Sequence, residues 1–320
     1  MLVYIQRRIL LMVPILIGVT LAVFLMLHAL PGDPVLMMLT EHSGGAAPTV
    51  TGTITDEMYE NMRRELGLDK PLHEQYIKFL FDVISGDWGN SFRTQLPVSE
   101  MLLKNLPYSI DLALASLGVS LIVGLILGII AAIKRGTWID NLTMTLAVTG
   151  VSMPNFWLGI MLLLIFSLNL RWIPAVAPAD SWQSLILPSL ALGFSAAAII
   201  ARLVRSNLID IFNQDYIRTA RAKGLMESVV VARHALKNAM IPVITVVGLQ
   251  FGNLLGGTVI IETVFARPGL GMIMIEGIME KDFPVVQGAV LFAAIAYVIA
   301  NFVVDITYAY LDPRITYDTK

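Results

Sequence analysis

Six long apolar runs dominate this sequence. They are Ile9–Leu30, Ser109–Ile133, Asn141–Leu170, Leu185–Leu203, Met240–Ile261 and Val286–Ala309. A helix crosses the hydrocarbon core of a bilayer with about 20 apolar residues, whereas barrel strands alternate over about 10 residues. Hydrophobic residues make up 56% of the chain and charged residues only 14%, far from the usual balance of a soluble protein. The sequence therefore predicts an all-α polytopic membrane protein with about six transmembrane helices.

Two of the runs have unusual features. The third is longer than one span needs and contains Pro154 and Asn155, which predicts a kink or a partial break. The first follows Arg7 and Arg8, as the apolar core of a signal peptide would. Its 22 apolar residues exceed the roughly 7–15 of a signal peptide, and no small-residue cleavage site follows. We expect it to be a retained helix.

Lys and Arg predict the orientation. With six spans, thirteen of them fall on one side: Arg7 and Arg8, Lys134 and Arg135, seven within 202–239, and two in the C-terminal tail. The short loops of the other side contain three, and the long loop 31–108 exceeds the length to which the rule applies. Both termini are therefore expected in the cytoplasm, with loop 31–108 outside.

Several classes of function are disfavoured. The chain has no cysteine, and its net charge of −2 gives no basic footprint for nucleic acid. It contains no G-x-x-x-x-G-K-[ST] phosphate loop, no G-x-S-x-G elbow and no H-E-x-x-H metal motif. We expect no enzyme activity from this chain alone, and neither a cofactor nor a metal ion bound to it.

The external loop 31–108 has a pattern of its own. A stretch rich in Gly, Ser, Thr and Pro, Glu41–Thr55, precedes two segments with helical periodicity, Asp56–Leu66 and Leu72–Ile84. Gly67 and Pro71 are the stop and start signals between them. A small helical cap over the outer mouth is one interpretation, and a solvated spacer is the other.

The cytoplasmic loop 202–239 is the most informative segment. Both of its halves favour helix, with Gly224 as the joint between them. Ala220 and Ala222 are too small to build a core, whereas Arg218 and Lys223 add charge around them. A short cationic helix of this kind suits docking into a groove of another protein. Positive residues in an ordinary cytoplasmic loop remain the alternative.

Small and polar residues recur inside the runs. Gly248, Gly252 and Gly256 form a double G-x-x-x-G in the fifth, the spacing that lets helix backbones approach closely. Polar residues at membrane depth suggest a translocation path, for which Asn155, Gln250 and Asn253 are weak candidates. They are amides, however, which more often bond helices together, and no buried acid–base chain is evident for a proton-coupled carrier.

The cytoplasmic loop resembles the "EAA" loop of ABC-importer permeases, specifically that of the B-type permease of dipeptide and oligopeptide (peptide/nickel) importers. The segments that carry the resemblance span nearly the whole chain. They are Tyr4–Arg8, Leu30–Pro34, Glu65–Pro71, Gly86–Gly89, Ser152–Pro154 with Phe156 and Trp157, Tyr216–Leu225, His234–Pro242, Pro268–Gly271, Asp282–Gly288 and Leu311–Ile315.

The sequence departs from the general EAA pattern in two places, and both narrow the resemblance to one subfamily. Where the general pattern has Glu-Ala-Ala six residues before its glycine, this chain has Arg218-Thr219-Ala220, and its proline is delayed to Pro242. Both look like the peptide and nickel subfamily's own version. The insertion around His42–Thr53 is less family-like and receives no role.

The resemblance implies a single permease domain, 1–320, with the type I ABC importer fold in the cytoplasmic (inner) membrane of a bacterium or archaeon. Its partners would be a second homologous permease, two cytosolic ABC ATPases that bind ATP and Mg, and an external substrate-binding protein. Arg218–Leu225 would be the coupling helix, with Gly224 permitting its bend. The coupling-loop residues that it implies are Tyr216, Arg218, Thr219, Ala220, Arg221, Ala222, Lys223, Gly224, Leu225, His234, Asn238 and Pro242.

The predicted function is import of dipeptides or short oligopeptides, driven by ATP and alternating access. A first alternative keeps the scaffold and changes the solute to a nickel chelate, glutathione or an oligosaccharide. A second is an ATP-independent channel or secondary carrier, for which an ATPase-docking helix would have no use. A purely structural scaffold is disfavoured by the two loops together.

Overall fold

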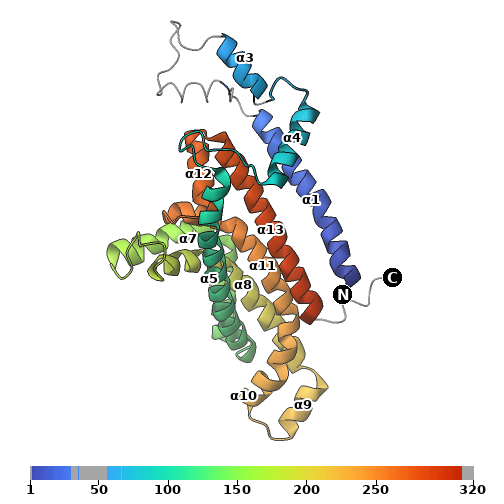
Figure 1. Cartoon of the computed structure of the whole chain (residues 1–320). Coiled ribbons are helices and arrows are strands. Elements are labelled where there is room, and N and C mark those ends of the chain that lie inside the picture. The colour runs from blue at the N-terminus through green and yellow to red at the C-terminus, as the bar shows by residue number, and fades with distance from the viewer. Residues whose placement is uncertain (1, 30–34, 36–55, 66, 312–320) are drawn as a thin grey trace. The chain divides into compact units, whose positions relative to one another are not determined.

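The computed structural model describes residues 2–29, 35, 56–65 and 67–311 (Figure 1). Two sequence segments, Glu41–Thr55 and the motif Leu30–Pro34, lie outside these residues, as does the tail after Leu311. The described residues form helices joined by loops and contain no β-strand. They are α1 (Leu2–Ala29), α3 (Asp56–Glu65), α4 (Leu72–Ser85), α5 (Val98–Ile133), α6 (Trp138–Ser152), α7 (Asn155–Leu162), α8 (Gln183–Phe212), α9 (Asp215–Ala222), α10 (Glu227–Val229), α11 (Leu236–Val264), α12 (Leu270–Glu280) and α13 (Phe283–Leu311), with the π-helical turns η1 (Leu163–Asn169) and η2 (Val230–Ala235).

Among the described residues, five helices are long and apolar enough to cross a membrane, and a sixth span results if α6 and α7–η1 are counted together. The five are Ile5–Met26, Val98–Ile133, Gln183–Phe212, Glu227–Val264 and Phe283–Val304. The break predicted at Pro154 and Asn155 is present, and it turns the chain by 107°. Pro154 cannot donate the hydrogen bond that would continue α6, so α7 begins after it in a new direction.

The chain divides into two compact units, the first of which contains the cytoplasmic loop. It comprises Met1–Ile5, Pro107–Met272 and Tyr297–Lys320. Helix α8 is its centre and packs against α6, α7 and α11. Glycines allow α5 to lie close to α8: a Cβ on Gly124 would be 2.9 Å from the Ala197 carbonyl, and one on Gly128 would be 2.7 Å from the Ala201 carbonyl.

The second unit comprises Gln6–Leu106 and Ile273–Ala296. Helices α3 and α4 fall where the sequence predicts them, and both boundary signals are used. Gly67 has a φ of +72°, and Pro71 is the last residue before α4. Gly86 ends α4 in the left-handed conformation, in which its N–H bonds the Val83 carbonyl.

Candidate functional site

Helix α9 follows the end of α8 and is fixed by two apolar side chains. Ile217 is fully buried and Ala220 is 7% exposed, in a cluster with Leu208 of α8, Val230 of η2 and Val243 of α11. Ala220 therefore packs inward, not on the docking face that the small-residue pattern suggests. The outward surface of α9 presents Arg218, Thr219, Arg221 and Ala222.

The turn after α9 depends on Gly224. Its φ is +77°, a left-handed conformation that side chains with a branched Cβ resist. Nothing lies within 4 Å of the position that a Cβ would occupy. The backbone angle, rather than lack of space, is therefore the reason for glycine at this joint.

Polar contacts close the α9–α10 hairpin. Arg221 donates through Nη2 and Nε to the two carboxylate oxygens of Glu227, at 2.6 and 3.1 Å. Its guanidinium also lies 5.5 Å from the centre of the Phe212 ring. The hydrogen bond from Arg221 to Glu227 raises the pKa of the arginine. Asn238 of α11 donates to the Tyr216 hydroxyl at 2.9 Å, so two predicted loop residues 22 positions apart meet.

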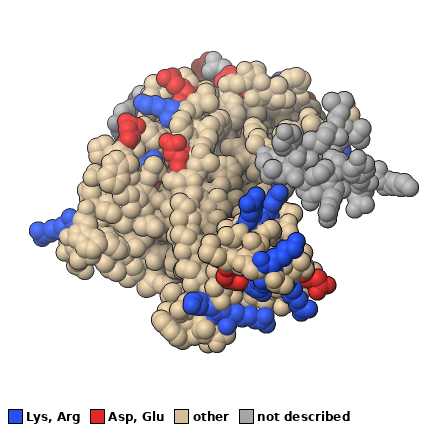
Figure 2. All heavy atoms as spheres, turned by 90° about the horizontal axis from the view of Figure 1, so that it is seen from below, with Lys and Arg blue, Asp and Glu red and all other residues tan. Residues whose placement is uncertain are grey.

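The end of the molecule formed by α9 and α10 is positively charged. Figure 1 shows these helices projecting beyond α8 and α11, and Figure 2, seen from that side, shows Lys and Arg gathered there. The exposed cations of this segment are Arg218, Arg221, Lys223, Arg233 and Lys237. Two apolar residues in the turn, Leu225 at 40% and Met226 at 71%, are also exposed. We call this exposed surface of residues 215–228 the loop surface.

The other predicted loop residues lie farther along the chain. His234 is half-buried in the π-helical turn η2, and Pro242 lies within α11, whose helix continues through it. Because Pro242 has no backbone N–H, we expect the carbonyl of Asn238, four residues earlier, to lack its helical hydrogen bond. The structure thus joins the two halves of the loop through Tyr216 and Asn238.

A buried ion pair near this end is not evident from the sequence. Asp140, 2% exposed at the start of α6, accepts from Arg205 Nε at 2.6 Å and from Nη2 at 2.7 Å. It also accepts from the Gly136 backbone N–H at 3.0 Å. This bidentate pair ties α6 to α8. The 65 residues between the partners explain why no local pattern reveals them.

Of the residues suggested for a translocation path, Asn253 is exposed, whereas Gln250 and Asn155 are buried or half-buried. Gln250 is 7% exposed and accepts a hydrogen bond from Asn253 at 3.1 Å, within one helix. Asn155 is half-buried at the start of α7. In the glycine stripe, Gly252 faces Asn301 and Tyr297 of α13, whereas Gly256 has open space around it. Gly248 is half-buried.

At the opposite end of the first unit, a buried carboxylate anchors the start of α12. Glu262 is fully buried and accepts from Ser109 Oγ at 2.6 Å and from the Gly271 N–H at 2.8 Å. The Leu270 N–H donates to Ser109 Oγ at 2.9 Å. A Cβ on Gly269 would collide with the Glu262 carboxylate. These contacts explain the glycines of the Pro268–Gly271 motif.

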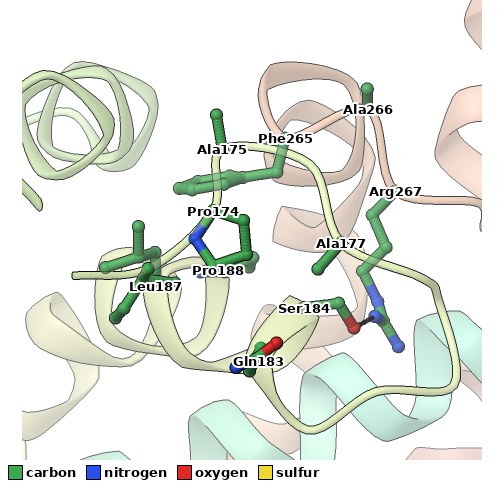
Figure 3. A pocket seen from close by; sticks show the side chains of 11 residues that line it. Pro174, Ala175, Ala177, Gln183, Ser184, Leu187, Pro188, Phe265, Ala266 and Arg267 are labelled. Atoms are coloured by element: carbon green, nitrogen blue, oxygen red, sulfur yellow. Dashed lines mark hydrogen bonds between the residues drawn. The ribbon is translucent and has the colours of Figure 1, made fainter. Parts of the chain in front are cut away.

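A small pocket, partly open to solvent, lies beside this anchor. Figure 3 shows its lining from the 173–177 loop, the start of α8 and the end of α11, with Arg267 and Ser184 pointing toward each other. Arg267 is 3% exposed and donates to Ser184 Oγ and to the Ala179 carbonyl. Burial lowers the pKa of its guanidinium, although Asp111 and Glu262 oppose this effect.

No catalytic or metal-binding arrangement is evident in the residues that the structure describes: they contain no group of three His, Cys, Asp or Glu side chains that could hold a metal ion. What they do contain is an exposed, cationic, rigidly held hairpin at one end of a helix bundle. Such an arrangement can bind a partner protein and transmit its movement to α8 and α11.

Comparisons with known proteins agree with this description. The family model "Binding-protein-dependent transport system inner membrane component" matches residues 124–317, and the corresponding N-terminal model matches residues 1–113. The chain is 44% identical over 318 residues to the glutathione transport system permease protein GsiC of Salmonella paratyphi A, covering 99% of this chain and 100% of that protein. The Escherichia coli protein of the same name is 42% identical with the same coverage.

A solved structure shares the fold. A chain of the MetNI methionine ABC transporter, in an inward-facing conformation, superposes with a TM-score of 0.56 at 20% identity, covering 66% of this chain and 96% of that one. The helical spans, the matched family models and the relatives over the full length together lead to one assignment. The chain belongs to the binding-protein-dependent transport system inner membrane components, as a multi-pass ABC-importer permease of the peptide/nickel family in the bacterial inner membrane.

Proposed function

We propose that this permease imports short peptides, with glutathione as the first candidate substrate. The observation that carries the proposal is the 44% identity to a glutathione transport permease over 99% of the chain. Glutathione is a tripeptide, and it is one of the solutes named in the first alternative of the sequence analysis. Dipeptides and other short peptides are the nearest alternative.

The permease would act within a larger assembly. A second homologous permease would complete the channel, two cytosolic ATPases would bind ATP and Mg, and an external binding protein would deliver the peptide. The absence of a phosphate-loop motif from the sequence supports placing ATP hydrolysis in other subunits. The family description, which names dependence on a binding protein, supports the external partner.

Arg218–Leu225, most of which belongs to α9, would be the coupling helix that the ATPases bind. Burial of Ile217 and Ala220 against α8, η2 and α11 supports this role, because a push on the hairpin then moves those helices with it. The exposed cations and the apolar Leu225 and Met226 supply a surface that a protein groove can hold. ATP-driven closure of the ATPases would turn the permease from inward- to outward-facing.

The test is uptake by the complete assembly. The chain would be co-expressed with the products of its neighbouring genes, purified as a complex and reconstituted in liposomes with the binding protein. Radiolabelled glutathione, a dipeptide, an unmodified tripeptide, a nickel chelate and an oligosaccharide would be compared with and without ATP. We expect ATP-dependent uptake of glutathione that exceeds uptake of the nickel chelate and the oligosaccharide at least about tenfold.

Each other result contradicts a defined part of the proposal. Preference for the dipeptide would retain the importer and replace its substrate. ATP-dependent uptake of the chelate or oligosaccharide alone would remove peptides from the assignment. Uptake that is equal without ATP would favour the channel or secondary carrier, and would contradict the coupling role of Arg218–Leu225.

A further inference from the structure

Helix α4 lies against the outer half of α1, inside the second unit. The Tyr76 hydroxyl donates to the Ile17 carbonyl at 3.2 Å and lies 3.0 Å from Thr20 Oγ1. The Phe24 ring is 5.4 Å from the Tyr76 ring and 6.0 Å from the Phe79 ring. One face of α4 is therefore packed on a helix that crosses the membrane (Figure 1).

These contacts reach well inside the bilayer. Ile17 lies nine residues before Met26, where the apolar span Ile5–Met26 ends. At about 1.5 Å per residue, this distance along the helix is about 14 Å. With the N-terminus in the cytoplasm, Met26 is the outer end. Tyr76 thus extends into the outer half of a hydrocarbon core that is about 30 Å thick.

The turn after α4 is held at a similar level by another helix. The Trp88 ring lies 5.7 Å from that of Phe292, nine residues after Phe283, where the last span begins at its outer end. A Cβ on Gly288 would be 3.5 Å from Trp88 Cε3 and 2.5 Å from Val98 Cγ1, so the turn packs closely on α13. Helix α4 therefore lies between two contacts that are both within the outer half of the membrane.

A second face of α4 is apolar and exposed. Ile77, Phe81 and Ile84 follow one another at helical spacing and are 50%, 69% and 81% exposed. Leu21 and Leu25 of α1, close to the residues that α4 contacts, are also 41% and 50% exposed. The apolar face of α4 thus continues the lipid-facing surface of a transmembrane helix. We call Ile77, Phe81 and Ile84 the α4 stripe.

Polar residues occupy a different sector and the following turn. Lys78, Ser85, Asp87 and Asn90 are exposed, and Asp87 accepts a hydrogen bond from the Gly89 N–H at 3.2 Å. Exposed non-helical backbone is tolerated at membrane depth only where it faces water or protein. The two sectors of this segment therefore require different surroundings.

We propose that α4 and the turn 86–90 form a re-entrant segment, with the α4 stripe against the acyl chains of the outer leaflet and the turn facing water. The segment thereby separates lipid from an aqueous space on the outer side of the permease. Lipid is favoured over a protein partner because the stripe has no polar atom and continues the apolar surface of α1. The inference does not depend on which solute is transported.

Site-directed spin labelling tests both sectors. The chain has no cysteine, so single cysteines can be introduced without removing any from it. Phe81→Cys and Ile84→Cys would report on the stripe, Ser85→Cys on the adjacent polar sector, and Leu25→Cys on α1 as the lipid reference. Each would be labelled in the assembled transporter, with reactive cysteines of the partner subunits replaced, and reconstituted in liposomes.

Frequent collision of the nitroxide with oxygen indicates that the label lies in lipid. Frequent collision with a neutral nickel chelate indicates that it lies in water. We expect Phe81 and Ile84 labels to match Leu25, and the Ser85 label to collide with the nickel chelate several-fold more often. Stripe labels that match Ser85 would overturn the proposal in favour of water. Stripe labels shielded from both reagents would overturn it in favour of a protein partner. If the Phe81 variant does not assemble, Ile77→Cys gives the same measurement.

Discussion

Gly224 is the residue whose backbone most restricts substitution at the loop surface. Its φ is +77°, and a Cβ at this position would meet nothing within 4 Å. We expect Gly224→Val to leave the protein inserted but to uncouple ATP hydrolysis from uptake, because a β-branched residue forces the turn into another conformation. ATPase rate and peptide uptake, measured on the same reconstituted complex, give the ratio that should fall.

Gly224→Asn is the matched control, because asparagine tolerates the left-handed conformation. It should retain most of the uptake per ATP hydrolysed. If valine is as well coupled as glycine at this position, the turn has no part in coupling. If both variants fail equally, the side chain and not the backbone angle is responsible.

Ser109 forms hydrogen bonds both with the buried Glu262 carboxylate and with the backbone at the start of α12. It donates to Glu262 at 2.6 Å and accepts from the Leu270 N–H at 2.9 Å. Ser109→Ala leaves one donor and one acceptor unsatisfied in a buried place. We expect it to destabilise the protein by about 1–3 kcal/mol, measured as a lower thermal unfolding midpoint in detergent.

Ser152→Ala is the comparison for that measurement. Ser152 is exposed and bonds only the Val148 carbonyl four residues earlier in its helix. Its removal should change stability by less than about 0.5 kcal/mol. Equal unfolding midpoints for the two variants would show that the anchor at Glu262 contributes nothing measurable.

At the level of elements, the glycine stripe of α11 divides into two parts. A Cβ on Gly252 would lie 2.9 Å from Asn301 Oδ1 and 3.0 Å from Tyr297 Cε2, whereas one on Gly256 would meet nothing. Gly252→Leu should therefore disturb packing of α11 on α13 and reduce the yield of folded permease, measured by size-exclusion chromatography.

Gly256→Leu is the counterpart on the open part of the stripe. It should preserve the folded chain, and any loss that it causes should appear in pairing with the second permease. A folded yield that is unchanged in Gly252→Leu would mean that α11 and α13 separate readily. That outcome would contradict the close packing described here.

The ion pair between Asp140 and Arg205 joins α6 to α8 through two hydrogen bonds. Asp140→Asn removes the charge that compensates a partly buried guanidinium. We expect a loss of about 1.5–3 kcal/mol of stability, measured by thermal unfolding. A double-mutant cycle with Arg205→Gln isolates the pair. Additive effects of the two substitutions would show that they do not interact.

Local rules predict many of these elements, but not how they meet. Gly67 and Pro71 are sufficient to separate α3 from α4, because each restricts its own backbone. The sequence predicts the 107° turn after α6 only as a kink or break: Pro154 ends the helix, but packing of α7 on α8 sets the new direction. The position of α4 against α1 depends on Tyr76 and Ile17, which are 59 residues apart.

At the scale of the whole molecule, Lys and Arg gather at the α9–α10 end, on the face that Figure 2 shows. Replacing both Arg218 and Lys223 by Glu should weaken binding of the ATPases, because long-range electrostatic attraction is lost. For the same reason, the affinity of the variant should depend less on salt concentration than that of the wild type. Co-purification at several salt concentrations measures it. Lys104→Glu, an exposed lysine near the start of α5, is the control and should have no effect.

The candidate site is partly predictable at this scale. The proposed coupling loop is a contiguous segment with a recognisable residue pattern, so the amino-acid sequence alone is enough to propose Tyr216–Leu225 for this role. The inward packing of Ala220 is not predictable in this way, because it depends on Leu208 and Val243, which the chain brings from other helices. The buried hydrogen bond between Glu262 and Ser109 is not predictable for the same reason, because a single glutamate at the end of an apolar run does not indicate which distant residue it contacts.

Asp282, a buried residue just before α13, bonds the segment around Ser91 in the outer part of the second unit, and this has a consequence for how the protein is made. Asp282 accepts from Ser91 Oγ at 2.6 Å and from the Phe92 N–H at 3.2 Å, across 191 residues of chain. At about 5–20 residues per second, a ribosome needs roughly 10–40 s to travel from one partner to the other. During this interval Ser91 has been synthesised, but Asp282, whose carboxylate accepts its hydrogen bond, has not. The outer segment around Ser91 therefore lacks this buried partner until synthesis has reached the beginning of the last span.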